Sequence, residues 1–344
     1  MRKKVRVGII GCGAIAQHLH GPDYACSPDA ELVACCDVVK KKAQLLAGRL
    51  APDALIFSDY KEMLKKAGVE AVSVCLPNYL HAPVTITALK AGCHVLVEKP
   101  MATSMAEARK MLDAAKKADR VLMVNQSQRL FPAHVKAKEV MDSGIMGKVL
   151  HITAMFGHSG PEDWSPTGKW FFNKKEARFG AMADLGVHKA DLLRFLTGKE
   201  VSEVNGFFER LEKPRATVED NFVSALKFTD GTVGTLAASW TVKGAEANYT
   251  VLHCANGTLQ ICLFPDRPLV ANLIKPCCQI VFELPPPPTN AAGGWGLDAG
   301  GAFCRAIKGE EKPYCTGYEG MKSLEVILAA EKAALTGRTV KIKH

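Results

Sequence analysis

The chain has 344 residues, of which 48% are hydrophobic and 23% are charged, a composition typical of soluble globular proteins. No apolar run approaches the roughly 20 residues of a membrane-spanning helix, so we expect no membrane partner. The net charge is +9, but most basic residues are interspersed with acidic ones, and the lack of a long basic stripe or a known reading motif excludes a nucleic-acid partner.

The twelve cysteines include no C-x-x-C pair. The basic and apolar start of the chain superficially resembles a secretion signal, but Arg6 and three glycines interrupt it. We therefore expect reduced thiols in a cytoplasmic protein. The cysteine spacing predicts no metal site.

Short apolar runs alternate with helical segments in residues 1–124. The runs lie at 5–10, 32–36, 55–57, 71–76, 94–97 and 121–124, and the helical segments at 14–24, 40–50, 60–67, 82–91 and 104–118. Alternating strands and helices predict βαβ units and a parallel sheet. Strands that are apolar throughout are typical of a sheet covered on both faces. We predict an α/β fold whose N-terminal domain, 1–124, is a doubly wound parallel sheet.

The pattern changes in residues 125–344. A turn and an edge-like strand are expected within 142–158, a helix that closes at Gly198, and a last helix at 317–335. Further strand signals lie at 204–208, 221–228, 232–240, 249–253, 258–262 and 279–283. Asp-Gly at 230–231 and Asn-Gly at 256–257 are strong hairpin signals. The sequence predicts an α+β domain with a mostly antiparallel sheet.

The stretch G-C-G-A-I-A at 11–16 follows the first expected strand and opens the first helix. Gly11 permits a tight turn, Gly13 lets the backbone approach a pyrophosphate, and Ala16 allows close helix–strand packing. Ala14 and Ile15 complete the candidate cofactor loop. The amide groups at the start of the helix would then point at the phosphates. The pattern predicts a dinucleotide site of the Rossmann type.

Asp37 ends the second expected strand, 21 residues after Ala16. A carboxylate at this place accepts hydrogen bonds from ribose hydroxyls. It favours NAD, because it would repel the 2′-phosphate of NADP. The lysines at 40–42 leave NADP possible, or they are simply the solvated start of a helix.

Two turns after expected strands carry further candidates. Glu98-Lys99 precedes a proline at the carboxyl end of a strand, where ligands bind in such sheets. Pro77-Asn78, with His81 three residues later, would line the nicotinamide side of the cofactor. Taken alone, these residues would be a surface ion pair and ordinary turn or cap residues.

Asp184, His188 and Asp191 are spaced i, i+4 and i+7. If the segment is helical, the three side chains share one face. Two acids and a histidine on one face, beside small residues that allow close approach, predict a site.

Together the motifs resemble the glucose–fructose oxidoreductase/inositol dehydrogenase (Gfo/Idh/MocA) family. The resemblance covers nearly the whole chain: V-G-I-I-G-C-G-A-I-A at 7–16, L-P-N-x-x-H at 76–81, H-V-L-V-E-K-P at 94–100, S-x-R-x-x-P at 127–132, S-G-x-x-G-K-V at 143–149, D-L-G-V-H-x-x-D at 184–191 and T-G-R-T-V at 336–340. It implies a Rossmann domain followed by an open-faced antiparallel sheet that binds substrate and forms a homodimer or homotetramer.

The resemblance also implies a dehydrogenase that acts on CH–OH groups of a sugar, inositol or related polyol. The family's catalytic lysine falls on Lys99, and its Asp and His fall on Asp184 and His188. Loss of a hydride requires the hydroxyl to lose a proton, and His188 is the preferred general base. Lys99 stabilises the developing charge on the oxygen, and Asp184 orients the substrate or holds the imidazolium. Whether Lys99 or His188 takes the proton stays open.

Other features leave the substrate undefined. Many relatives carry a glycine run before the aspartate, where this chain has R-F-G-A-M at 178–182. Trp164, Lys169 and Trp170 lie in a stretch that either contacts a sugar ring and an anionic group or is an ordinary packed loop. Two other functions remain: an NAD-dependent glycoside hydrolase of the same family, and a non-catalytic NAD- or sugar-sensing regulator.

Overall fold

The structure is a computed structural model that describes residues 3–286 and 288–343. Its internal contacts divide the chain into two compact units, Met1–Ser127 with Pro287–Met321, and Gln128–Pro286 with Lys322–His344. The expected division into 1–124 and 125–344 did not include this return of the chain to the first unit. The returning segment contributes α9 (Ala299–Ile307), which packs against α1 (Gly21–Cys26).

The first unit is built on a six-stranded parallel sheet in the order β3-β2-β1-β4-β5-β6, the strand order of the Rossmann fold. Its strands are β1 (Val5–Ile10), β2 (Ala30–Cys36), β3 (Leu55–Phe57), β4 (Ala71–Val74), β5 (His94–Val97) and β6 (Leu122–Val124). The predicted doubly wound parallel sheet is confirmed.

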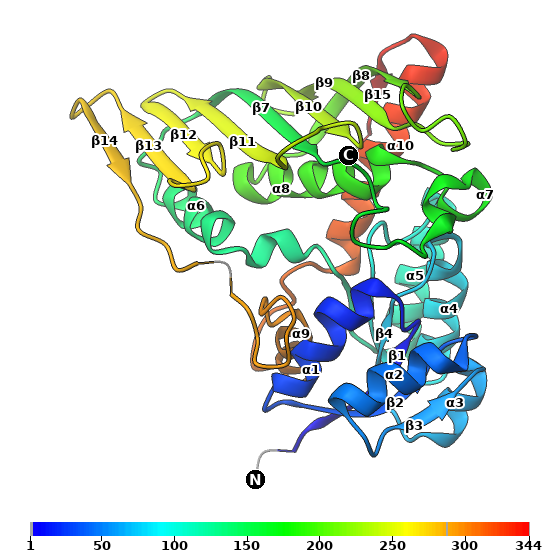
Figure 1. The fold of residues 1–344 in the computed structure, drawn as a ribbon. Helices are drawn as coiled ribbons and strands as arrows, with labels where there is room; N and C mark the ends of the chain where they lie inside the picture. Colours follow the sequence, from blue (N-terminus) through cyan, green and yellow to red (C-terminus); the bar gives the residue numbers. More distant parts are fainter. Residues whose placement is uncertain (1–2, 287, 344) are drawn as a thin grey trace. The chain divides into compact units, whose positions relative to one another are not determined.

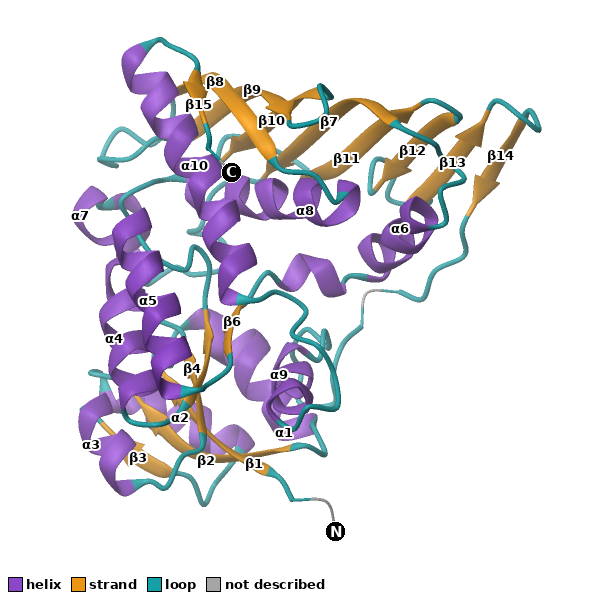
Figure 2. Cartoon of the chain, turned by 180° about the vertical axis from the view of Figure 1, so that it is seen from behind, coloured by secondary structure: helices purple, strands orange, loops and turns teal. Residues whose placement is uncertain are grey.

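Helices cover both faces of this sheet, and Figure 2 shows α4 and α5 on one side of the strands and α1 and α9 on the other. The remaining helices of the unit are η1 (Ala16–His20), α2 (Lys40–Leu50), α3 (Tyr60–Lys66), α4 (Asn78–Lys90) and α5 (Met105–Ala118). Side-chain caps define two helix starts. The Ser104 hydroxyl accepts the Glu107 N–H before α5, and the Asp59 carboxylate accepts the Lys61 N–H before α3.

The second unit contains a nine-stranded sheet in the order β14-β13-β12-β11-β7-β10-β9-β8-β15. Its strands are β7 (Val149–Gly157), β8 (Val201–Glu209), β9 (Asn221–Phe228), β10 (Val233–Ser239), β11 (Ala247–Cys254), β12 (Gly257–Ile261), β13 (Leu269–Leu273), β14 (Cys278–Val281) and β15 (Val340–Lys341). Only the β7–β10 pair is parallel among the described strands of this sheet. The hairpin turns predicted at 230–231 and 256–257 connect β9 to β10 and β11 to β12.

β7 lies in the middle of this sheet, between β10 and β11, so the prediction of an edge-like strand is wrong. His151 and Thr153 are polar residues in the middle of this strand. They alternate with the buried Ile152 and Ala154, which places the polar side chains on the face opposite the core. A central strand of a one-sided antiparallel sheet carries the same alternation as an edge strand.

The helices of the second unit gather on one face of the sheet (Figures 1 and 2). They include α6 (Pro132–Asp142), η4 (Met182–Gly186), α8 (Val187–Thr197) and the later part of α10 (Gly317–Thr336). Three shorter helical segments are η2 (Ser127–Leu130), η3 (Lys169–Phe172) and α7 (Lys174–Ala177). Of the described helices, none covers the opposite face in either view. None of them is long and apolar enough to span a membrane.

Candidate active site

The turn after β1 has the geometry that a dinucleotide loop needs. Gly11 has a φ of +90°, and a Cβ atom there would come within 2.2 Å of the Cys75 carbonyl oxygen, so no larger residue fits. A Cβ at Gly13 would meet no described atom within 4 Å. Gly13 therefore leaves open space beside the backbone, and its carbonyl accepts the Gln17 N–H at 3.0 Å as the helix with Ala14 and Ile15 begins.

Asp37 is anchored to this turn. Its carboxylate accepts the Cys12 N–H and the Val39 N–H, both at 2.8 Å. Each oxygen keeps a second lone pair, so the carboxylate can still accept hydrogen bonds from a ligand. This arrangement fits the predicted role of Asp37, which stays a prediction.

The turn after β4 leads directly into α4, which begins at Asn78 with Pro77 as its N-cap residue. The helix starts four residues before the expected 82–91 segment, because Pro77-Asn78 is the helix start and not a separate turn. His81 is buried inside the helix, and its ring nitrogens lie 2.7 Å from the carbonyl oxygens of Pro100 and Leu76. The His81 ring thus links the backbone of the two turns, and its predicted place beside the nicotinamide stays a prediction.

Lys99 lies two residues after the end of β5, at the carboxyl edge of the parallel sheet, as expected. Glu98, the residue before it, is 6% exposed. The Glu98 carboxylate lies 2.8 Å from His20 Nε2 and accepts a hydrogen bond from Asn125 Nδ2 at 2.6 Å. Sequence reasoning assigned Glu98 to the cofactor and overlooked His20 and Asn125, which neither motif nor spacing distinguished.

In the second unit, Asp184 lies in a π-helical turn, η4, and His188 in α8, which continues from it. The two side chains are 6% and 8% exposed. Trp240 Nε1 donates a hydrogen bond to Asp184 Oδ2 at 3.0 Å, and His158 Nε2 lies 4.0 Å from the same oxygen. Trp240 and His158 follow β10 and β7, and no sequence signal identified them. The Asp184 carboxylate therefore lies beside the indole N–H of Trp240 and the imidazole of His158.

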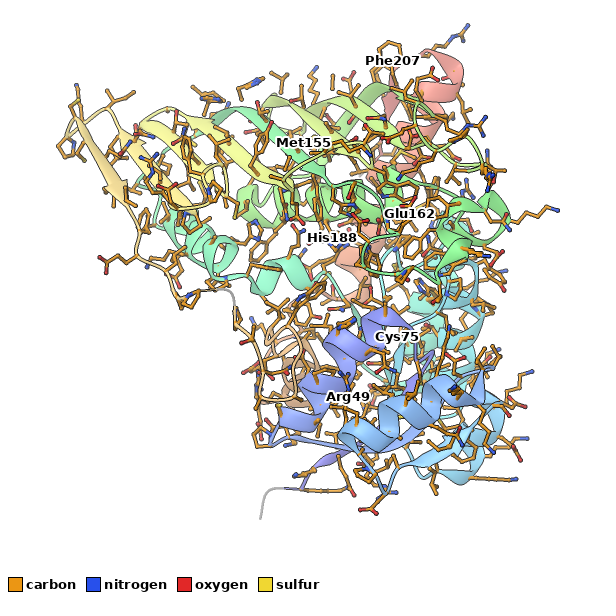
Figure 3. The ribbon with its side chains drawn as sticks, viewed as in Figure 1. Arg49, Cys75, Met155, Glu162, His188 and Phe207 are labelled. Atoms are coloured by element: carbon orange, nitrogen blue, oxygen red, sulfur yellow. The ribbon has the colours of Figure 1, made fainter. Side chains whose placement is uncertain are left out.

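The ring of His188 faces that of Phe156, with centroids 5.9 Å apart, and Figure 3 places His188 on the helix side of the sheet. Asp191 serves a different purpose from the other two members of the motif. It accepts hydrogen bonds from Arg129 at 2.7 and 2.8 Å and from Ser323 at 2.9 Å. Asp191 is therefore the buried ion-pair partner of Arg129, the arginine of the S-x-R motif.

The backbone geometry at the start of η4 explains two residues of the unusual R-F-G-A-M sequence at 178–182. Gly180 is required, because a Cβ atom there would come within 1.8 Å of the Glu219 carbonyl oxygen. Arg178 adopts a φ of +68°, which is strained for a residue with a side chain. Its guanidinium donates to Glu331 at 3.0 Å and lies over the Phe179 ring. These contacts anchor a backbone geometry that glycine would adopt without strain.

Glu219 holds the start of η4, since its Oε1 accepts the N–H groups of Gly180 and Met182 at 2.8 and 3.0 Å. Burial raises the pKa of this carboxyl from 4.5 to about 7. The native state therefore keeps a proton that the unfolded chain releases, and the free energy of unfolding falls as the pH rises from about 4.5 to about 7. We expect Glu219→Gln to raise the free energy of unfolding at pH 8 by up to about 3 kcal/mol.

Urea unfolding at pH 5 and pH 8 measures this effect as the difference between wild type and Glu219→Gln. The exposed Glu209→Gln is the matched control and should show no pH-dependent difference. Equal stability of wild type and Glu219→Gln at pH 8 would contradict the raised native pKa of Glu219.

The tryptophans expected near the substrate are packed into the second unit. Trp170 stacks on Phe171 with ring centroids 3.8 Å apart, and Trp164 meets the same ring edge-on at 5.3 Å. Lys169 is exposed. These contacts support the packed-loop alternative for the two indole rings, and substrate contact by Trp164, Lys169 or Trp170 stays a prediction.

Comparisons with known proteins agree with these features. A family model described as an oxidoreductase family with an NAD-binding Rossmann fold matches residues 5–126, and one described as the GFO/IDH/MocA C-terminal domain matches residues 134–260. D-glucoside 3-dehydrogenase of Escherichia coli is 30% identical over 98% of this chain and 97% of its own length.

Myo-inositol 2-dehydrogenase of Thermotoga maritima is 29% identical over 99% of both chains. A crystal structure of aldose-aldose oxidoreductase from Caulobacter crescentus, complexed with glycerol, has a TM-score of 0.85 at 26% identity and covers 99% of this chain and 100% of that chain. The chain belongs to the GFO/IDH/MocA family of NAD(P)-dependent dehydrogenases that act on CH–OH groups of sugars.

Proposed function

We propose that this protein transfers a hydride between NAD and a secondary alcohol, or the corresponding ketone, of a sugar, inositol or related polyol. The observation that carries the proposal is the complete candidate set of Lys99, Asp184 and His188, with the Asp184 carboxylate held by Trp240 at 3.0 Å. The names of the relatives, a glucoside dehydrogenase and an inositol dehydrogenase, support the substrate class.

The first unit supplies the groups that would hold the cofactor. The open side of Gly13 and the helix start beside it fit a pyrophosphate, and the Asp37 carboxylate fits ribose hydroxyls. Pro77 and Asn78 would border the nicotinamide. A nicotinamide cofactor bound there supplies the hydride acceptor for oxidation and the donor for reduction.

The remaining chemistry falls to side chains of the protein. We assign His188 as the general base that takes the hydroxyl proton, because imidazole titrates near neutral pH. Lys99 donates a hydrogen bond to the same oxygen and stabilises its negative charge. Asp184, fixed by Trp240, accepts a hydrogen bond from a substrate hydroxyl or from the imidazolium.

Absorbance at the NADH band tests the proposal. The purified protein is mixed with NAD or NADP and a panel of inositols, aldoses and sugar acids. A substrate-dependent rise supports the dehydrogenase and selects cofactor and substrate class together. A flat trace across the panel, with NAD nonetheless bound, overturns the dehydrogenase proposal in favour of the glycoside hydrolase or the sensor. A panel of glycosides then distinguishes these two functions.

We expect Asp37→Ala to raise the Kd for NAD by about 10- to 100-fold, as expected for lost hydrogen bonds to a charged group. Binding of NADP should fall less or improve, because the repulsion of its 2′-phosphate is removed. Quenching of tryptophan fluorescence measures both constants. Asp59→Ala, which removes a carboxylate that caps α3, is the control. An unchanged preference for NAD would remove Asp37 from the cofactor site.

We also propose that a second copy of the chain covers the open face of the nine-stranded sheet. Phe207 and Val223 are direct cross-strand partners on this face and are 74% and 46% exposed. Figure 3 shows Phe207 and His188 on opposite sides of the sheet. Exposed apolar pairs of this kind mark association surfaces. Sedimentation equilibrium should give a homodimer or homotetramer, and a monomer at micromolar concentration would contradict the proposal.

A further inference from the structure

A buried polar network lies under the turn that carries Lys99. His20 is the last residue of η1, and its ring is 1% exposed. One ring nitrogen lies 2.8 Å from Glu98 Oε1, and the other lies 2.9 Å from the Ser73 hydroxyl. The Tyr24 hydroxyl is 2.7 Å from the same Ser73 oxygen. Both ring nitrogens of His20 are thus engaged by side chains from neighbouring strands and turns.

The His20–Glu98 contact is an ion pair. Burial lowers the pKa of His20, but Cys75 and Glu98 outweigh it and hold that pKa well above its usual range. Burial raises the pKa of the Cys75 thiol, while the neighbouring His20 lowers it. Burial alone would raise the pKa of Glu98, yet His20, Lys99 and Asn125 bring it below its usual value.

The pair joins two parts of the first unit that serve different ligands. His20 closes the π-helical turn that follows the glycine loop, whereas Glu98 is the residue directly before Lys99. The Lys99 N–H also lies 3.3 Å from Glu98 Oε2. The position of the Glu98 carboxylate therefore fixes the backbone from which the Lys99 side chain departs.

The opposite side of Glu98 is fixed as well. Asn125, which follows β6, donates to Glu98 at 2.6 Å and accepts a hydrogen bond from the Tyr314 hydroxyl at 2.8 Å. A buried ion pair contributes little net stability compared with apolar side chains of the same volume. These charges therefore serve orientation, and π-turns such as η1 often occur at functional sites.

We propose that His20 is a positioning residue for Lys99: through its ion pair with Glu98 it locks the Lys99 turn to the helix that follows the glycine loop. This inference rests on the proposed function only for its effect on turnover. The effect on the Lys99 side chain itself is independent of any substrate.

The test compares His20→Leu with His20→Gln, whose amide can still donate to Glu98. A side chain misplaced by about 1 Å costs about 100-fold in rate, so we expect His20→Leu to lower kcat by about 10- to 100-fold with the KM for NAD changed by less than about threefold. His20→Gln should recover most of the loss. His94→Leu, at the other end of β5, is the matched control and should retain wild-type kcat.

Acylation of lysines by acetic anhydride, read by peptide mass spectrometry, provides a readout without turnover. His20→Leu should change the labelling rate of Lys99 by at least about threefold, because the position of a nucleophile affects its reactivity. Lys90 and Lys110 are internal controls and should be labelled at the wild-type rate. If His20→Leu unfolds, the double variant His20→Leu/Glu98→Leu removes both charges and should show the same altered Lys99 labelling.

Unchanged Lys99 labelling in the folded variants overturns the proposal, as does a kcat loss that His20→Gln fails to recover. The two proposals can fail separately. If the wild-type protein shows no turnover but His20→Leu changes Lys99 labelling, the positioning role stands and only the dehydrogenase is rejected.

Discussion

Replacement of Lys99 by methionine is expected to lower kcat by about 10²- to 10⁴-fold, the range seen when a proton-transfer group or a donor to a developing oxyanion is lost. Methionine keeps an unbranched apolar stem as long as that of lysine and lacks the ammonium group. The proposed role of that group is to stabilise charge that develops on the substrate oxygen. The KM for NAD should therefore change far less than kcat.

Steady-state kinetics on the substrate identified by the NADH panel measure the effect. Lys110→Met, an exposed lysine of the same unit, is the control and should behave as wild type. His188→Ala should lower kcat by a comparable factor, and the pH dependence of the residual rates separates the two roles. The variant that loses the acidic limb of the rate profile lacks the general base. Full turnover in both variants would reject the catalytic assignment.

The parallel and antiparallel character of the two sheets could be predicted from the sequence because each rests on a local pattern. Apolar strands between helices predict a parallel sheet, and Asp-Gly or Asn-Gly turns predict hairpins. Both patterns act within about ten residues of chain. The central position of β7 escaped prediction, since a strand next to an open face looks the same as an edge strand. The order of strands depends on long-range pairing that a single sequence does not display.

The candidate site divides in the same way. The sequence alone could predict four candidate residues, because each lies at a fixed distance from a strand end: Gly11, Gly13, Asp37 and Lys99. His20 and Trp240 were not, because they reach Glu98 and Asp184 across 78 and 56 positions of the chain. The π-helical turns η1 and η4 were also missed, since regular 3.6-residue spacing is the assumption behind the helix prediction.

Asp191 shows how a motif can combine residues with different purposes. Its helical spacing from Asp184 and His188 suggested one functional face, but its carboxylate is paired with Arg129, and the two side chains are 1% and 3% exposed. We expect Asp191→Ala to lower the free energy of unfolding by about 3–5 kcal/mol, because the guanidinium loses its buried carboxylate partner. The midpoint of thermal unfolding should fall on the order of 10 °C.

Scanning calorimetry measures this loss, and Glu139→Ala, which breaks an exposed pair with Lys136, should cost less than about 1 kcal/mol. The double variant Arg129→Met/Asp191→Leu should recover most of the stability, because apolar residues replace a buried ion pair at little net cost. Below its unfolding transition, Asp191→Ala should keep kcat within about tenfold of wild type, since no reacting group is removed. A catalytic loss as large as that of Lys99→Met, with stability unchanged, would instead place Asp191 among the reacting groups.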